Sequence, residues 1–354
     1  MNLSKQAGES AAQTPVPAME PGLLLEVRNL KKYFPIERGF LRRVVGHVRA
    51  VDDVSLSVPE GKTLGLVGES GCGKTTLGRC ILRAIEPSAG HVLMRIDERV
   101  VDITALPPKQ MRAVRRHMQM VFQDPYSSLD PRKTILDIVG EPLRLNKMAE
   151  GRDLQQRVRE LMEVVGLNVR YLKRYPHAFS GGQRQRIGLA RALSLNPKLI
   201  VCDEPVSALD VSVQAQILNL FQDLQKQFNL TYLFVAHDLS VVEHISDEVA
   251  VMYVGKVVEQ AETEELFQNP KHPYTEALLS AVPHPNPNRP LHEIQLQGEI
   301  ANPANPPSGC YFHPRCRYAK EICRAEPPPR LEVGPRHFAA CHFAHELSLQ
   351  GVEV

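Results

Sequence analysis

The chain has 354 residues, and its 42 Lys and Arg against 40 Asp and Glu leave a formal net charge of +2. This balance does not indicate a nucleic-acid-binding surface, so no nucleic-acid partner is expected. The sequence has no run of 18 apolar residues, which excludes a predicted membrane-spanning helix. Residues 1–22 lack the apolar core of a signal peptide, and we expect a flexible polar lead-in on a cytosolic protein.

From residue 23 to about residue 268, apolar runs alternate with amphipathic ones. Strands buried on both faces are predicted where short apolar runs are rich in β-branched residues, at 63–68, 118–123, 198–204 and 231–238. Helices are predicted where apolar residues recur at helical spacing, at 75–85, 154–166 and 214–228. This alternation predicts an α/β fold with a largely parallel sheet. Residues 23–30 and 47–58 predict an antiparallel addition to it.

The sequence "GESGCGKTT" matches the phosphate-loop pattern G-x-x-x-x-G-K-[ST] and lies between a predicted strand and a predicted helix. In such a loop the backbone N–H groups surround the β-phosphate, the lysine reaches the β- and γ-phosphates, and the Thr75 hydroxyl is a ligand of Mg²⁺. The residues that this motif assigns to ATP are Gly68, Glu69, Ser70, Gly71, Cys72, Gly73, Lys74, Thr75 and Thr76.

Polar residues follow three further predicted strands. Asp203 ends one of them and is expected to hold Mg²⁺, and the next residue, Glu204, is expected to polarise an attacking water. Gln123 and His237 come at equivalent strand ends, where nucleotide sites of such sheets are built. On local pattern alone, a structural role is favoured over a nucleotide contact for each of these two residues.

A second potential anion site lies in "FSGGQRQRIGLARAL", residues 179–193. A serine and two glycines precede an evident helix, whose first N–H groups and positive dipole end suit a phosphate. However, no lysine follows the glycines, and a complete phosphate loop already exists upstream.

Taken in order, "GESGCGKT", "FSGGQ", "LIVCDE", "SALD" and "VAHD" resemble the motif set of an ATP-binding cassette (ABC) ATPase over about 245 residues. The resemblance implies a RecA-like core, an antiparallel β subdomain and a helical signature subdomain. It also implies that Ser180, Gly181, Gly182 and Gln183 bind the γ-phosphate held by the opposite subunit of a dimer. Two cassettes would then close around two ATP molecules.

The resemblance implies further roles. Gln123 resembles the glutamine that senses Mg²⁺ and contacts the membrane partner, His237 resembles the switch histidine, and residues 207–210, ending at Asp210, resemble the loop that crosses the dimer interface. An aromatic side chain in "LKKYFPI" is expected to stack on adenine. Its place in the pattern L-x-K-x-aromatic favours Phe34, with Tyr33 as the alternative.

Protein complexes of several different functions contain such a cassette. Only 57 positions separate Gln123 from Ser180, so the long coiled-coil insertion of DNA-repair relatives is absent, and ribosome-associated relatives usually carry two cassettes in one chain. A transporter subunit is therefore expected, and a soluble ABC ATPase acting on nucleic acid or ribosomes is the competing hypothesis.

Segments beyond the general motifs resemble the second ATPase subunit of dipeptide and oligopeptide importers. They are "VFQDPYSSLDPRKT", "NPKHPYTEALLSAVP" and "PPSGCYFHPRC". This resemblance implies a peripheral subunit on the cytoplasmic face of the bacterial inner membrane. The implied partners are a second, nonidentical ATPase, two permease chains and an extracytoplasmic solute-binding protein. Nickel and glutathione importers share much of the pattern and remain alternatives.

Composition changes near residue 270. Between Pro270 and Pro335 lie 14 of the 28 prolines, which excludes a long helix or a central strand. The expected organisation is a lead-in at 1–22, an ATPase domain at 23–268 and a small Cys- and Pro-rich module at 269–354. Four of the seven cysteines lie in this module, at Cys310, Cys316, Cys323 and Cys341.

In a reducing compartment, such a cysteine cluster indicates a metal rather than disulfides. Spacing alone does not choose between zinc and a [4Fe–4S] cluster, and His313, His337, His342 and His345 are possible substitute ligands. Resemblance to peptide-importer ATPases that carry an iron–sulfur cluster favours [4Fe–4S], with Zn²⁺ as the alternative. The other three cysteines, Cys72, Cys80 and Cys202, are expected to be ordinary small apolar residues.

Overall fold

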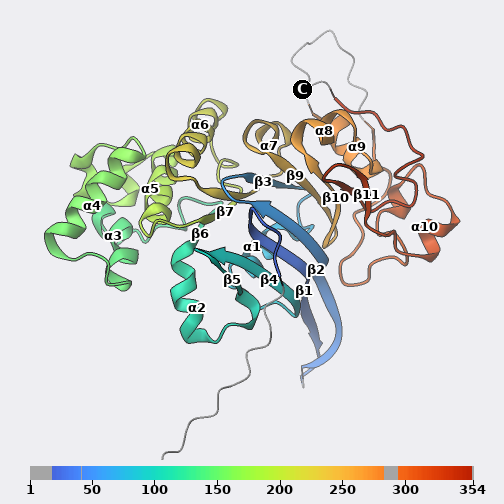
Figure 1. Ribbon diagram of the computed structural model, residues 1–354, viewed down its shortest axis with the longest axis horizontal. Helices are drawn as coiled ribbons and strands as arrows, with labels where there is room; N and C mark the ends of the chain where they lie inside the picture. The colour runs from blue at the N-terminus through green and yellow to red at the C-terminus, as the bar shows by residue number, and fades with distance from the viewer. Residues whose placement is uncertain (1–17, 41, 283–293, 353–354) are drawn as a thin grey trace, which may run out of the picture.

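The computed structural model describes residues 18–40, 42–282 and 294–352, and it contains two β-sheets with helices on either side (Figure 1). The larger sheet has eight strands in the order β11-β12-β10-β9-β3-β8-β7-β6. Neighbouring strands from β9 to β6 run parallel, and β10, β12 and β11 pair antiparallel at the other edge. Its strands are β3 (Thr63–Val67), β6 (Met118–Val121), β7 (Leu199–Asp203), β8 (Thr231–Val235), β9 (Glu248–Tyr253), β10 (Lys256–Glu262), β11 (Leu331–Gly334) and β12 (His337–Ala339).

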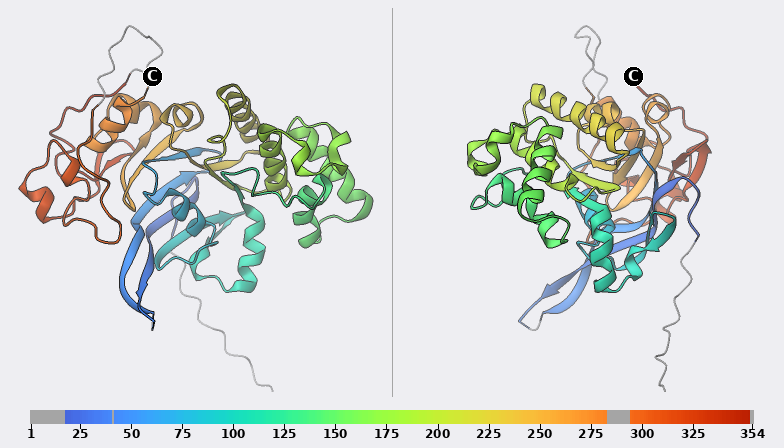
Figure 2. Two further views of the ribbon diagram at one scale, coloured as in Figure 1. Left: turned by 180° about the vertical axis from the view of Figure 1, so that it is seen from behind. Right: turned by 60° about the vertical axis from the view of Figure 1, so that its left-hand side comes forward.

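The smaller sheet is antiparallel, as the sequence predicts for this part of the chain. Its order is β2-β1-β4-β5, with β1 (Leu23–Arg38), β2 (Arg43–Pro59), β4 (Ala89–Ile96) and β5 (Arg99–Asp102). The far end of the long β1–β2 hairpin projects beyond the body of the molecule in both views of Figure 2. Residues 1–17 of the expected lead-in lie outside the described residues, whereas Met19 is buried against Leu23 and Leu93 of this sheet.

The helices occupy three places. Helix α1 (Lys74–Ile81) lies between the two sheets, where it contacts β1, β2, β7 and β8. A helical lobe made of α3 (Ile135–Leu145), α4 (Gly151–Val164) and α5 (Gly181–Leu193) lies at the end of the molecule opposite the C-terminal residues (Figures 1 and 2). The remaining helices are α2 (Pro108–Val114), α6 (Val211–Phe228), α7 (Leu239–Ile245), α8 (Thr263–Gln268), α9 (Pro273–Ser280) and α10 (Glu321–Ala325).

The predicted helix at 75–85 is shorter than expected. It ends at Ile81, and Arg83 adopts a left-handed conformation with φ 48°. A left-handed residue cannot continue a right-handed helix, so the chain turns there toward β4.

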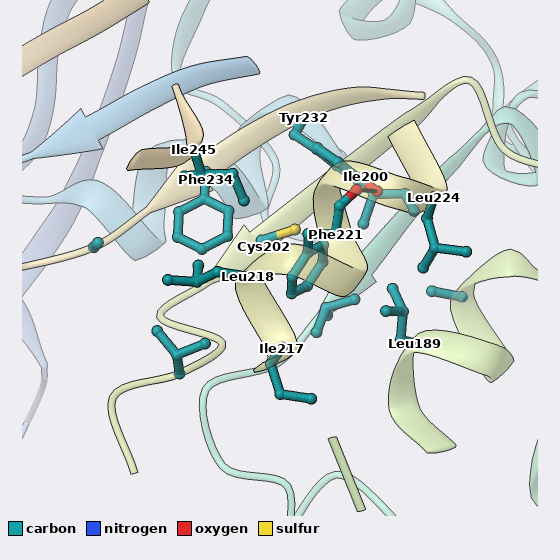
Figure 3. Packing of buried hydrophobic residues seen from close by; sticks show 14 of the residues in the cluster. Leu189, Ile200, Cys202, Ile217, Leu218, Phe221, Leu224, Tyr232, Phe234 and Ile245 are labelled. Carbon is teal, nitrogen blue, oxygen red and sulfur yellow. Dashed lines mark hydrogen bonds between the residues drawn. The ribbon is translucent and has the colours of Figure 1, made fainter. Parts of the chain in front are cut away.

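Alternate residues of the parallel strands enter two separate cores. Ile200, Cys202, Tyr232 and Phe234 face the helices on one side, whereas their neighbours along the same strands face α1 and the smaller sheet. On the first side, the ring of Phe221 in α6 lies edge-on to Tyr232 and Phe234, with ring centroids 5.5 and 5.7 Å apart (Figure 3). Burial on both faces is why these strands read as continuous apolar runs.

The C-terminal residues are joined to the main sheet rather than merely appended to it. Strand β12 pairs with β10, and the buried carboxylate of Glu259 in β10 contacts Nε2 of His337 in β12 at 2.8 Å. The same carboxylate accepts hydrogen bonds from the backbone N–H groups of Lys271 and His272. Strands β12 and β11 therefore extend the edge of the main sheet, and the apolar cluster around Ala339 and Cys341 is small.

Among the described residues, no helix combines the length and apolar character needed to cross a membrane.

Candidate nucleotide-binding site

The predicted phosphate loop connects β3 to α1, and its glycines are required by its shape. Gly68, Gly71 and Gly73 have φ values of 149°, 79° and 111°. A Cβ at Gly73 would lie 2.0 Å from the carbonyl oxygen of Ala50, and a Cβ at Gly68 would lie 2.1 Å from that of Met252. Only glycine fits such positions. Gly73 also caps α1 with no side-chain hydrogen bond, so the first N–H groups of this helix are available to an anion.

Lys74 and Thr75 occupy the positions that phosphate and Mg²⁺ chemistry requires. The Lys74 side chain is almost fully buried, and its ammonium group donates hydrogen bonds to the carbonyl oxygens of Gly68 at 2.7 Å and Glu69 at 3.2 Å. The Thr75 hydroxyl donates to Oδ1 of Asp203 at 2.8 Å. Burial raises the pKa of Asp203, and this hydrogen bond opposes the rise. A hydroxyl beside a buried carboxylate fits Mg²⁺, whose positive charge would reverse the effect of burial.

Glu204, Gln123 and His237 form one hydrogen-bonded group. Oε2 of Glu204 accepts a hydrogen bond from the Gln123 amide at 2.9 Å and lies 3.1 Å from Nδ1 of His237. Glu204 has a left-handed backbone with φ 44°, and its N–H donates to the carbonyl oxygen of Val235 at the end of β8. Strained backbone of this kind is concentrated at functional sites.

These groups surround one cavity of about 320 Å³. Of the predicted residues, Ser70 to Thr76, Gln123, Glu204 and His237 line it, and Asp203 lies behind Thr75. The cavity therefore contains the phosphate loop and the expected water-orienting group. Five lining residues had no signal in the sequence, because antiparallel pairing and the C-terminal segment bring them in from distant positions: Val48, Arg49, Ala50, Gly255 and Pro303.

The two candidate aromatic residues differ in their contacts. The Tyr33 hydroxyl donates to Oδ1 of Asp52 at 2.5 Å, so this side chain is held by a structural hydrogen bond. Phe34 lies directly opposite Val48 and Tyr33 opposite Arg49 in the β1–β2 register, and both Val48 and Arg49 line the cavity.

The second predicted anion site lies elsewhere. Ser180 caps α5, where its hydroxyl oxygen accepts a hydrogen bond from the Gln183 N–H and the Gln183 side chain accepts one from the Ser180 N–H. Gly182 is needed because a Cβ there would lie 2.5 Å from Val213 at the start of α6. Asp210 caps α6 by accepting a hydrogen bond from the Val213 N–H. Ser180 and Asp210 are exposed, and neither residue lines the cavity.

The four C-terminal cysteines also meet, around a small cavity of about 20 Å³. Burial, the larger cause, and the neighbouring cysteines of the group together raise the pKa of Cys316 to about 11 and that of Cys341 to about 12. Among the described residues, no three His, Cys, Asp or Glu side chains are arranged to hold a metal ion. The four cysteines thus line one cavity, but the prediction of a metal centre is not supported by the described residues.

Two of the four histidines that were considered as substitute ligands lie at the cysteine cavity, and two do not. His313 and His342 line the cysteine cavity, whereas His345 does not. His337 was a wrong candidate, because its ring contacts the carboxylates of Glu259 and Glu265 instead.

Two family models match the sequence. The model described as "ABC transporter" matches residues 51–207, and the model described as "Oligopeptide/dipeptide transporter, C-terminal region" matches residues 258–323. Among solved structures, the dimeric ATP-binding cassette MJ0796 in a post-hydrolysis state with ADP and Pi is similar, with a TM-score of 0.59 and 27% identity. The match covers 68% of this chain and 99% of that one. The predicted ABC-type α/β fold is confirmed.

Two curated relatives match nearly the whole chain. The oligopeptide transport ATP-binding protein AppF of Bacillus subtilis (strain 168) is 54% identical over 323 residues, covering 90% of this chain and 97% of its own length. The di/tripeptide transport ATP-binding protein DppF of Pseudomonas aeruginosa (strain UCBPP-PA14) is 48% identical over 327 residues, covering 91% and 98%. With its phosphate loop, its Thr75–Asp203 pair and these relatives, the chain belongs to the ATP-binding subunits of ABC transporters, and it is a transport-coupled ATPase.

Proposed function

We propose that this chain powers a bacterial importer of dipeptides or oligopeptides. The main support is the likeness, over about nine-tenths of the chain, to proteins whose names state oligopeptide or di/tripeptide transport. The match to the C-terminal transporter model adds support, because it covers a region outside the cassette motifs. Neither a nickel or glutathione importer nor a soluble nucleic-acid or ribosome ATPase is favoured by these relatives.

Within the cavity we assign a role to each residue. Lys74 and the backbone N–H groups of residues 68–76 hold the phosphates of ATP, and Thr75, Asp203 and Gln123 hold Mg²⁺. Bound there, Mg²⁺ neutralises the charge that develops on the transferred phosphoryl group. Glu204 orients the attacking water and accepts its proton. Gln123 and His237 both contact Oε2 of Glu204, so we assign the proton to Oε1.

Phe34 is our choice for the adenine contact. The Tyr33 hydroxyl is already engaged by Asp52, and successive side chains of a strand point to opposite faces. Phe34 lies opposite Val48, which lines the cavity, and Tyr33 lies opposite Arg49, which lines it as well, so the choice rests on the engaged hydroxyl of Tyr33. We retain Tyr33 as the alternative, because its half-buried ring lies on the same hairpin.

The signature residues 180–183 serve a second nucleotide, which the opposite subunit holds. Their place outside the cavity supports this assignment, because the phosphate loop of the same chain lies among other residues. Asp210 lies in the loop that we place at the dimer interface. The opposite subunit is a second, nonidentical ATPase, and the pair acts on two permease chains fed by an extracytoplasmic solute-binding protein. The assembly places this chain on the cytoplasmic face of the inner membrane.

We also propose that the cysteine module holds a [4Fe–4S] cluster. Four thiols around one enclosed cavity supply the ligands that such a cluster needs. The raised pKa values of Cys316 and Cys341 express the cost of forming thiolates there, and the positive charge of bound iron would offset that cost. A cavity of about 20 Å³ is close to the space of one water, so the side chains around it must move outward.

The assembly is tested by purifying the tagged chain from native membranes in mild detergent and identifying its partners by mass spectrometry. We expect two polytopic permeases and a second cassette ATPase. The matching solute-binding protein, titrated with dipeptides, glutathione and Ni²⁺, should bind the peptides most tightly. Recovery of ribosomal proteins or nucleic acid without a membrane chain would contradict the proposal.

Glu204→Gln should reduce ATP hydrolysis by the assembled complex about 100-fold or more while leaving Mg·ATP affinity unchanged, because the amide cannot accept the proton from water. Steady-state hydrolysis and equilibrium nucleotide binding measure the two effects. Glu98→Gln, in the exposed turn between β4 and β5, is the matched control. Hydrolysis by the Glu204 variant at the control rate would exclude Glu204 as the base.

Protein purified without oxygen should be brown and contain about four iron and four acid-labile sulfide atoms per chain. Cys316→Ser should lower both contents, whereas Cys80→Ala should not, because Cys80 lies in α1 and away from the cysteine cavity. Colourless protein with one zinc per chain would show that the cluster assignment is wrong.

A further inference from the structure

The five residues between the first two cysteines of the module, 311–315, lie against the nucleotide-binding domain. Three side chains of this inter-cysteine segment make the contacts. Tyr311 donates a hydrogen bond to Oδ2 of Asp52 at 2.7 Å, and Phe312 is buried, with its ring centroid 5.3 Å from that of Tyr253 and 5.4 Å from that of Tyr274. The third side chain, Arg315, reaches the phosphate loop.

Arg315 and Glu69 form a bidentate ion pair. Nη1 of Arg315 lies 2.7 Å from Oε2 of Glu69, and Nη2 lies 3.0 Å from Oε1. The Arg315 side chain is 7% exposed and that of Glu69 is 24% exposed, so solvent screens this pair less than an ordinary surface pair. Two parallel charge-assisted hydrogen bonds also fix the orientation of both groups. Hydrogen bonding to Glu69 accordingly raises the pKa of Arg315.

Glu69 is the second residue of the phosphate loop. Its N–H donates to the Tyr274 hydroxyl at 2.9 Å, and its carbonyl oxygen accepts a hydrogen bond from the Lys74 ammonium group. The carboxylate is directed to Arg315, while the next residue, Ser70, lines the cavity. Without a cation beside it, this carboxylate would repel a triphosphate bound next to it.

The backbone of the inter-cysteine segment holds Arg315 next to the cysteine cavity. Arg315 directly precedes Cys316, and the backbone of the segment closes in tight turns, with hydrogen bonds from the His313 N–H to the Cys310 carbonyl oxygen and from the Cys316 N–H to that of His313. Both ends of the segment therefore carry side chains of the cysteine cavity.

We propose that Arg315 is a positioning residue for the phosphate loop, through which the cysteine module sets the affinity of this chain for Mg·ATP. The guanidinium group holds Glu69 in place and neutralises its charge. This inference rests on the proposed nucleotide site, and it gives the motif "SGCYFHPRC" a role in nucleotide binding.

The test measures Mg·ATP affinity of the full-length chain and KM and kcat of the assembled complex. Arg315→Gln should weaken binding about tenfold, since it removes a charge-assisted pair and leaves Glu69 unneutralised. The weaker binding should appear as a higher KM for ATP, with kcat nearly unchanged, because Glu204 and its partners are untouched. Arg315→Lys, which keeps the charge but not the bidentate geometry, should give an intermediate affinity.

A double variant separates this role from simple packing. Glu69→Gln combined with Arg315→Gln should restore affinity to within about threefold of the original chain, because no uncompensated carboxylate remains beside the phosphates. Arg317→Gln is the matched control. Arg317 belongs to the same module and pairs with Glu276 at 3.0 Å, a residue outside the phosphate loop, so its loss should leave affinity unchanged.

Unchanged affinity in Arg315→Gln, or a double variant no better than Arg315→Gln alone, would overturn the inference. The Lys74→Ala variant distinguishes failure of the Arg315 inference from failure of the proposed nucleotide site. If Lys74→Ala also bound Mg·ATP normally, the nucleotide site itself would be wrong.

Discussion

The site depends on one constraint, the burial of parallel strands on both faces. Strands β3, β6, β7 and β8 run in the same direction, so their carboxyl ends meet at one edge of the sheet. The phosphate loop follows β3, and Gln123 follows β6. Asp203 ends β7, Glu204 comes directly after it, and His237 follows β8. Two cores, one on each face, hold the strands in this arrangement. The polar side chains of the site therefore lie together where the strands end.

The same arrangement explains why one chain carries two anion sites. The helix dipole of α1 acts on the cavity, whereas the N-terminus of α5 belongs to the helical lobe and closes its own capping box with Ser180 and Gln183. In our account the two helix ends serve different nucleotides. In our account each chain supplies the phosphate loop of one site and the signature of another, and the C-terminal module supports the phosphate loop from behind through Arg315.

Local pattern predicted the parts of this protein whose cause is local. The phosphate loop, the strand-end carboxylates Asp203 and Glu204, and the antiparallel addition were readable, because glycine geometry and strand periodicity act over a few residues. Gln123 and His237 also follow strands, but their roles were implied only by the resemblance to ABC ATPases. Contacts that depend on long-range packing could not be predicted from local pattern. No spacing rule joins Arg315 to Glu69, or Pro303 to the cavity, since the chain between them must first fold. His337 failed as a candidate for a related reason, as its burial against Glu259 depends on β12 joining the sheet.

The most direct test of the account is the Ser180→Arg variant, measured for Mg·ATP affinity as an isolated chain and for hydrolysis in the assembled complex. Ser180 lies outside the cavity of its own chain, so we predict unchanged affinity together with loss of hydrolysis. Loss of affinity in the isolated variant would contradict a signature that acts on the nucleotide of the opposite subunit, and so would full hydrolysis by the variant complex.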